Sequence, residues 1–174
     1  MVEIDGILFE TMLPVQTIQV PQPGEYVPFY FGVHIINQSL ISYRFNLPGF
    51  FPEIFNSSGQ QVQASANSNA RRRMTNQDIP LIDPGERATF WTTVGLSWVS
   101  QSCFRLSGYI SYGAVWSTSN LELGTYHLQL AYRNHSPQYT TPLYTGTTYT
   151  TVEICDFWVG TVNTPLVKFC LVQS

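Results

Sequence analysis

The sequence has few charged side chains. Asp, Glu, Lys and Arg make up 11% of its 174 residues, against about 25% in a typical globular protein. Lys168 is the single lysine, and the net charge at pH 7 is −3. A chain with this balance lacks the basic surface that phosphate groups require. We therefore expect neither nucleic-acid binding nor attachment to an anionic membrane.

Long apolar runs are also missing. No stretch of 18 apolar residues occurs, and the first residues carry Glu3, Asp5 and Glu10 where a secretory signal has a basic segment and then an apolar one. We predict no transmembrane span and no secretory signal. On this basis we expect the chain to act in the cytoplasm.

Motifs for catalysis, cofactors and metals are missing as well. The chain has no Gly-x-Ser-x-Gly elbow for a serine nucleophile and no glycine-rich turn for a phosphate. Its cysteines are odd in number and lack CxxC spacing, and its histidines fall on separate segments. We predict no enzymatic activity, no catalytic residue, no cofactor and no metal. The cysteines are Cys103, Cys155 and Cys170, of which the last two lie in apolar alternations that favour inert core packing, and the histidines are His34, His127 and His135.

Large side chains at every second position are what the sequence does contain. Hydrophobic residues reach 44%, enough to form a core, and the length is typical of one domain covering residues 1–174. No helical periodicity is sustained, whereas alternation recurs along the chain. Its clearest case is residues 126–133, with Tyr126, Leu128, Leu130 and Tyr132 on one face and His127, Gln129, Ala131 and Arg133 on the other. The pattern predicts an all-β chain.

Turn residues separate these alternating segments. The sequence DPGE at residues 83–86 places proline where a turn needs a fixed φ, and Gly85 can then adopt the positive φ of a type II turn. In FGVHIINQSLISYRF, residues 31–45, the polar residues Asn37, Gln38 and Ser39 are predicted to form a bend between two extended segments. About eight short strands with this spacing predict two antiparallel sheets packed face to face.

The order of several segments resembles a known family. EIFNSSGQQV at residues 53–62, LIDPGE at residues 81–86 and LGTYHL at residues 123–128 follow one another in the order found in immunoglobulin-like β-sandwiches. Among these, the chain is similar to the bacterial intracellular proteinase inhibitors over residues 29–133. The resemblance implies an immunoglobulin-like antiparallel β-sandwich, with inhibition of a protease as its specific activity.

One loop concentrates positive charge. Arg71, Arg72 and Arg73 lie within ASANSNARRRMTN, residues 64–76, which is predicted to be a mobile loop. An arginine-bearing loop on a rigid sheet can enter a protease cleft as a substrate mimic, or bind an acidic partner through bidentate contacts. The alternative is that these charges simply keep a polar loop in water.

A long aromatic insertion covers residues 95–120. Trp98, Tyr109, Tyr112 and Trp116 are its candidate binding residues. Exposed tryptophan and tyrosine rings stack on sugars or form the hot spot of a protein interface, whereas buried rings close one end of a core. The segment YTTPLYTGTTYTT, residues 139–151, is predicted to be a hairpin or an edge strand of low charge. Such an edge invites pairing with a second copy, which makes a homodimer a further expectation.

Three functional hypotheses follow from these observations. The leading one is a non-enzymatic β-sandwich that binds a protein partner through its loops or an edge, with protease inhibition as the form that the resemblance implies. The alternatives are a carbohydrate-binding module that uses exposed aromatic rings, and a self-assembling structural subunit.

Overall fold

The structure is a computed structural model, and it describes residues 1–67, 79–100, 102–110, 114–145 and 148–173. Within these residues the regular structure is β-strand, apart from one short 3-10 helix, Leu47–Gly49. The prediction of an all-β chain is confirmed. The candidate residues Arg71, Arg72, Arg73 and Tyr112 lie outside the described residues.

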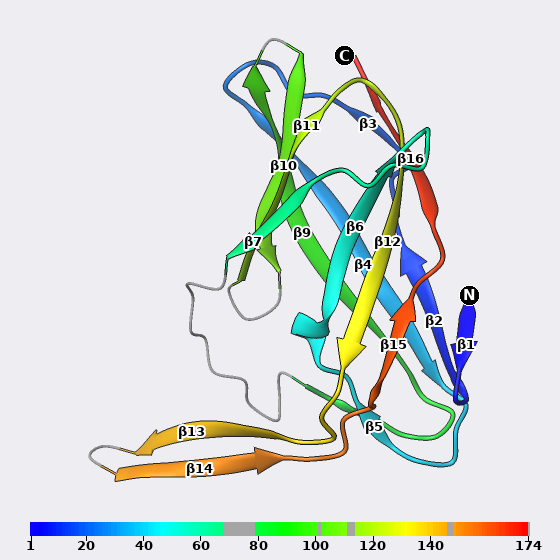
Figure 1. The fold of residues 1–174 in the computed structure, drawn as a ribbon, viewed down its shortest axis with the longest axis vertical. Helices are drawn as coiled ribbons and strands as arrows, with labels where there is room; N and C mark the ends of the chain where they lie inside the picture. The colour runs from blue at the N-terminus through cyan, green and yellow to red at the C-terminus, as the bar shows by residue number, and fades with distance from the viewer. Residues whose placement is uncertain (68–78, 101, 111–113, 146–147, 174) are drawn as a thin grey trace.

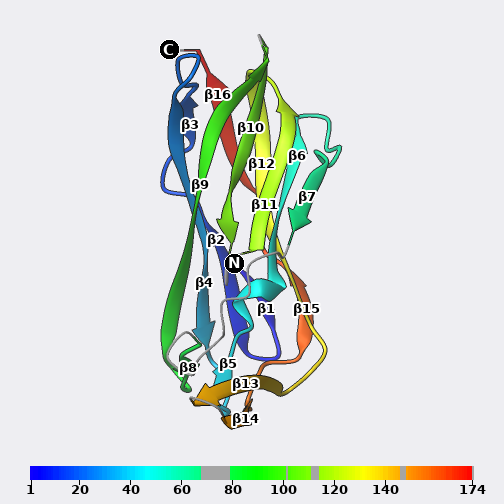
Figure 2. The ribbon, with the colours of Figure 1, turned by 90° about the vertical axis from the view of Figure 1, so that its left-hand side faces the viewer.

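Most strands belong to two sheets, which form two layers (Figures 1 and 2). The larger sheet is antiparallel, in the order β1 (Val2–Ile4), β2 (Ile7–Met12), β4 (Tyr26–Asn37), β9 (Arg87–Ser100), β10 (Cys103–Ile110), β11 (Ala114–Leu121) and β7 (Ala64–Asn67). The smaller sheet is centred on β12 (Gly124–Asn134), which pairs with β6 (Phe50–Asn56) on one side and with β15 (Gly160–Asn163) and β16 (Val167–Val172) on the other. Its last strand, β3 (Thr17–Gln19), runs parallel to β16.

Two further strand pairs lie outside these sheets. The strands β5 (Tyr43–Arg44) and β8 (Leu81–Ile82) form one of them. The strands β13 (Tyr139–Thr145) and β14 (Thr148–Ile154) form a hairpin that extends away from the two layers (Figure 1). A hairpin over residues 139–151 was one of the two structures predicted for that segment, and this form is confirmed.

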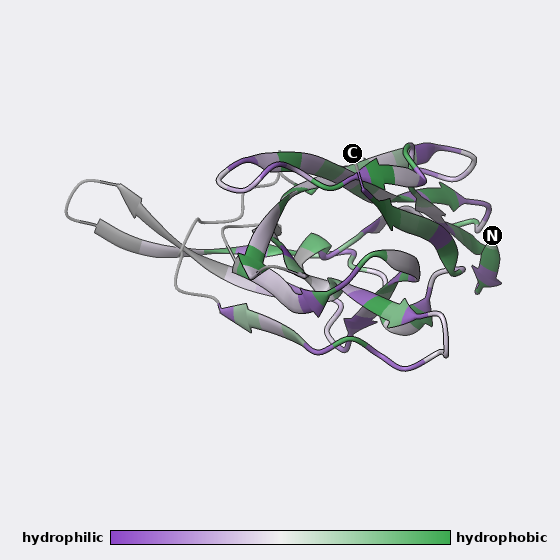
Figure 3. Cartoon of the chain, turned by 90° about the horizontal axis from the view of Figure 1, so that it is seen from above, coloured by the Kyte–Doolittle hydropathy of each residue, from purple (hydrophilic) through white to green (hydrophobic). Residues whose placement is uncertain are grey.

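The hydrophobic core lies between the two sheets. One connected cluster of buried side chains has members from both layers, and hydrophobic positions recur along the strands (Figure 3). The Phe29 ring on β4 lies 5.2 Å, between ring centroids, from the Phe169 ring on β16. Burying a side chain of this size contributes about 1.5–3 kcal/mol to the free energy of unfolding. Every second side chain of β4 is buried in this core and helps to hold the two layers together: Phe29, Phe31, Val33 and Ile35.

Asn37 organises the bend that follows β4. Its side-chain amide group donates to the carbonyl oxygens of Ile41 and Ile82, at 2.7 and 2.8 Å, and its oxygen accepts from the Ser39 backbone N–H. The Asn37 backbone N–H also donates to the carbonyl of Glu86. The predicted bend is confirmed. It is joined to the turn before β9, where Gly85 has the expected positive φ of 83°.

Candidate functional site

The structure separates the aromatic residues that were predicted together. Trp116 is fully buried and packs near Phe31, so it cannot offer a ring to a sugar. Trp98 is half-buried, and its indole N–H donates to the carbonyl of Pro21 at 2.6 Å. Tyr109 is exposed. For Trp116 the interpretation as an exposed binding residue is therefore wrong, and its ring fills the core as the alternative interpretation proposed.

The residues 95–120 that carry these rings are regular strand over most of their length. They comprise the end of β9 and the strands β10 and β11. The pairing of β10 shifts register beside Phe104 with both neighbours. In β11 the irregular step separates Thr118 from Leu121, which are both buried although they are three residues apart. Trp116 lies in the regular part of the pairing, opposite Gly108, on the same buried face as Thr118.

The histidines and cysteines form no metal centre in the described part of the chain, where no group of three metal-ligating side chains occurs. The Nδ1 atom of His34 lies 2.7 Å from the hydroxyl oxygen of Thr89 on the neighbouring strand. Cys155 is exposed, which contradicts its predicted place in the core, because it lies in the turn after the β14 strand. Cys170 is half-buried on the outward face of β16, between the buried Phe169 and Leu171, so its predicted place in the core is wrong as well. Among the same residues no helix is long and apolar enough to cross a membrane.

Among the described residues, the strand β9 is paired on both sides only at residues 94–97. Residues 87–97 pair with β4 on one side. On the other side β10 pairs with β9 from Val94 to Ser100, and no described strand pairs with residues 87–93. A strand edge in this state presents N–H and C=O groups that are available to another strand.

The edge of β6 that faces outward is incomplete in a similar way. At Ile54 this edge is covered by the segment that follows β6, because the Val62 backbone N–H donates to the Ile54 carbonyl at 2.8 Å. Residues 50–53 pair with β12 on one side, and among the described strands none pairs with them on the other. Residues 50–53 of β6 and residues 87–93 of β9 are thus edges with which no further described strand pairs, and both contribute to the lining of one cavity.

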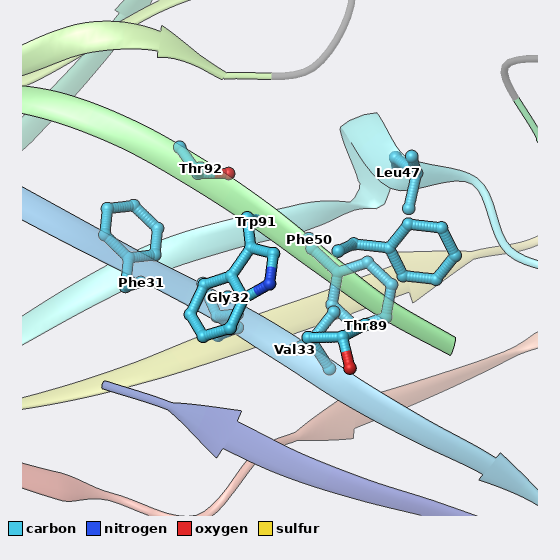
Figure 4. Close-up of a pocket in the computed structure, with 10 residues that line it drawn as sticks. Phe31, Gly32, Val33, Leu47, Phe50, Thr89, Trp91 and Thr92 are labelled. Atoms are coloured by element: carbon cyan, nitrogen blue, oxygen red, sulfur yellow. The ribbon is translucent and has the colours of Figure 1, made fainter. Parts of the chain in front are cut away.

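A cavity of about 200 Å³ lies at these two edges (Figure 4). Phe50 and Leu47 approach it from the β6 side, and Trp91 and Thr89 approach it from β9. Most of its lining side chains are apolar, and the polar side-chain groups are the hydroxyls of two threonines and one indole N–H, but polar atoms make up almost half of the exposed surface of the cavity. The complete lining is Phe31, Gly32, Val33, Leu47, Phe50, Thr89, Phe90, Trp91, Thr92 and Leu130.

The chemistry of this cavity is that of a binding site for an apolar group. None of its lining residues is ionisable in the physiological range, so its lining offers no general acid or base. Its volume is below the range of about 300–1,000 Å³ that small-molecule sites occupy. A single large side chain of a partner fits this description better than a cofactor does.

Neither of the two tyrosines with shifted pKa values lines the cavity, although the Tyr132 ring lies 4.4 Å from the ring of Phe50, between centroids. Burial raises the pKa of Tyr132 above its usual value of 10.0, and burial also raises the pKa of Tyr126. The Tyr132 hydroxyl accepts from the Asn46 backbone N–H at 3.3 Å and donates to the Trp158 carbonyl at 3.2 Å. The Tyr132 hydroxyl thus links β12 to the segments that contain Asn46 and Trp158, and it is not one of the groups that line the cavity.

Sequence reasoning did not bring the cavity residues together as a site. Phe31 and Val33 fall in residues 31–45, which were predicted to form two extended segments around a bend, and no binding role was predicted for any of the lining residues. What makes these residues a site is a missing neighbour beside β9, and no local pattern encodes the length of a pairing between strands.

Comparison with family models, with curated proteins and with solved structures found no match to this chain.

Proposed function

We propose that the chain is a non-enzymatic, immunoglobulin-like β-sandwich that binds an extended segment of a partner protein. The segment adds along residues 87–93 of β9, with which no described strand pairs on that side, and places an apolar side chain in the cavity at this edge. The observation that carries the proposal is that the unpaired edge and the apolar cavity lie side by side.

The strand pairing supports the immunoglobulin-like part of the proposal. In that fold one sheet contains the third, sixth and seventh strands and the other contains the first, second and fifth. Here β6, β12 and β16 are neighbours in one sheet, and β2, β4 and β9 are neighbours in the other. The pairs β10–β11 and β13–β14 are then additions to this plan.

A contact at the start of β12 supports the same assignment. The Tyr126 hydroxyl donates to the backbone carbonyl of Glu122 at 3.1 Å and accepts from the backbone N–H of Glu122 at 2.8 Å. A tyrosine that bonds back to the backbone a few residues upstream, near the start of the sixth strand, is a hallmark of these sandwiches. The segment LGTYHL, on which the resemblance rested, contains this tyrosine.

Strand addition explains how such a site would bind. An extended peptide beside β9 gains main-chain hydrogen bonds, which supply affinity, and every second side chain points toward the core, which supplies specificity. An apolar cavity below an unpaired edge therefore selects a peptide with a large apolar residue at one inward position. Inhibition of a protease is the form of partner binding that the family resemblance suggests, and proteases are the partner class to test at the outset.

The test uses a library of short extended peptides and a panel of proteases, with amide hydrogen exchange as the readout. A bound peptide or protease is expected to slow exchange in residues 87–93 of β9. Leu47 lies half-buried at the cavity, so the variant Leu47→Asp is expected to weaken binding by about tenfold or more. The control is Leu166→Asp, at a site with 54% exposure that does not line the cavity.

Two results would overturn the proposal. One is that no peptide and no protease binds. The other is binding that leaves exchange in residues 87–93 unchanged, since the partner would then occupy another surface. The exchange measurement uses the unaltered chain, so it decides the matter even where Leu47→Asp folds poorly.

A further inference from the structure

Exposed aromatic rings gather on the outer face of the larger sheet. In the described part of the chain, four aromatic side chains are about half exposed or more, and all four point outward from this sheet. They are Tyr26 at 72%, Tyr30 at 48%, Trp91 at 52% and Tyr109 at 70%. This outer aromatic face is on the opposite side of the sheet from the core, and it has no described element over it.

The pairing register brings three of these rings close together. Trp91 on β9 pairs with Gly32, two residues from Tyr30 on β4. Tyr30 pairs with Thr93 of β9. On the other side of β9, Gly108 of β10 pairs with Val94, so the next residue of β10, Tyr109, lies opposite Thr93. With strands about 4.8 Å apart and a rise of about 3.3 Å per residue, the Cα atoms of the three aromatic residues are about 8–10 Å from one another.

Two of the rings lie against the sheet because glycine is beneath them. A Cβ atom at Gly32 would be 3.1 Å from Cε3 of Trp91, and one at Gly95 would be 3.5 Å from Cδ2 of Tyr26. Figure 4 shows the Trp91 indole lying across Gly32. A ring held in this way offers its other face to solvent, as a flat apolar platform.

The positions between the rings carry hydroxyl groups. Among the outward residues of β9 and β10 near the rings, Thr93, Ser97 and Ser107 carry hydroxyl groups, and Arg105 lies opposite Ser97. The Thr89 hydroxyl is already in contact with His34. The hot spot of a protein interface is packed apolar surface with water excluded around it. Rings separated by hydroxyl groups instead match a ligand that alternates flat C–H faces with hydroxyls of its own, which is the chemistry of a pyranose chain.

We propose that the outer aromatic face binds a neutral oligosaccharide, with sugar rings stacked on Tyr30, Trp91 and Tyr109. A sugar's C–H groups meet the negative face of each aromatic ring, and the threonine and serine hydroxyls between the rings bond to sugar hydroxyls. The only charged side chain opposite the outward β9 positions 91–97 in the described pairing is Arg105, beside Ser97, and no described carboxylate lies there, so an uncharged glycan is the ligand to test at the outset. This site shares Trp91 with the cavity at the β9 edge, whereas Tyr30 and Tyr109 lie outside that cavity; it extends the function of the chain beyond protein binding.

The test measures binding to soluble β-glucan, xylan, mannan and starch by affinity electrophoresis and tryptophan fluorescence. Tyr30→Ala and Tyr109→Ala are expected to weaken binding by about fivefold to tenfold each. Tyr30→Phe and Tyr109→Phe keep the ring and are expected to retain most of the affinity. The control Val159→Ala removes an apolar side chain that is 45% exposed elsewhere on the chain, and it is expected to have no effect.

Three outcomes would overturn the carbohydrate site: binding of none of the four glycans, binding that both alanine variants leave unchanged, or loss of a protein partner in those variants with no glycan bound. Neither Tyr30 nor Tyr109 lines the cavity. Peptide binding at the β9 edge is therefore expected to survive both substitutions, so failure of one site is distinguishable from failure of the other.

Discussion

Replacing Gly32 with alanine tests the close approach of β4 and β9. A methyl group at this position would overlap the backbone carbonyl oxygen of Phe90, far inside the 3.0 Å below which Cβ atoms essentially never approach another heavy atom. It would also lie 3.1 Å from Cε3 of Trp91. The carbonyl belongs to the backbone of the paired strand, so no side-chain rotation removes the overlap.

The chain offers a matched control in Gly95. This glycine also faces outward in the same sheet and lies beside an aromatic ring, but a Cβ atom there would meet its nearest neighbours at 3.5 Å and beyond, which is ordinary contact. Forced overpacking costs about 1–3 kcal/mol, whereas a tolerated glycine-to-alanine change gains about 0.4–1 kcal/mol from the unfolded chain. We expect Gly32→Ala to be less stable than Gly95→Ala by about 2 kcal/mol.

Urea unfolding followed by tryptophan fluorescence measures this difference as a shift in midpoint at constant slope. In thermal unfolding it corresponds to a Tm difference of about 4–8 °C for a chain of this length. Equal stability of the two variants would refute the reasoning, because it would mean that the strands separate at Gly32 without cost.

Two further predictions concern buried polar groups. Tyr132→Phe leaves the Asn46 backbone N–H without its acceptor and is expected to lower the free energy of unfolding by about 1–2 kcal/mol at pH 7, measured by urea unfolding. Burial raises the pKa of Tyr132 above 10.0, so the unfolded chain releases the phenol proton at a lower pH than the folded chain does. The contribution of Tyr132 to the free energy of unfolding is therefore complete below pH 10 and is lost as the pH rises above it. The free energy of unfolding is expected to fall less steeply above pH 10 in Tyr132→Phe, and an equally steep fall would contradict this. Asn37→Ala leaves the carbonyls of Ile41 and Ile82 without the amide donor and is expected to cost about 2–4 kcal/mol, and a loss below 1 kcal/mol would show that water replaces the side chain.

The errors made from the sequence share a physical origin. Trp116 was a candidate for binding a ligand, yet it points inward, on the same face of β11 as the buried Thr118. Cys155 was expected in the core, yet it follows the end of β14 and is exposed. In both cases the local sequence does not say which face of a segment meets the other sheet, because that depends on how the strands pair.

The sequence alone determined the class of structure. Alternation with a period of two survives in any β-structure, because successive side chains point to opposite faces, and the turns at Asn37 and Gly85 followed from residue chemistry. Only the tertiary structure decided the two candidate sites. The outer aromatic face needs strands distant in sequence to lie in one register, and the cavity needs β10 to end its pairing at Val94. Both sites depend on which strands pair and over how many residues. The free energy that favours one pairing over another comes from contacts throughout the core and not from any local segment.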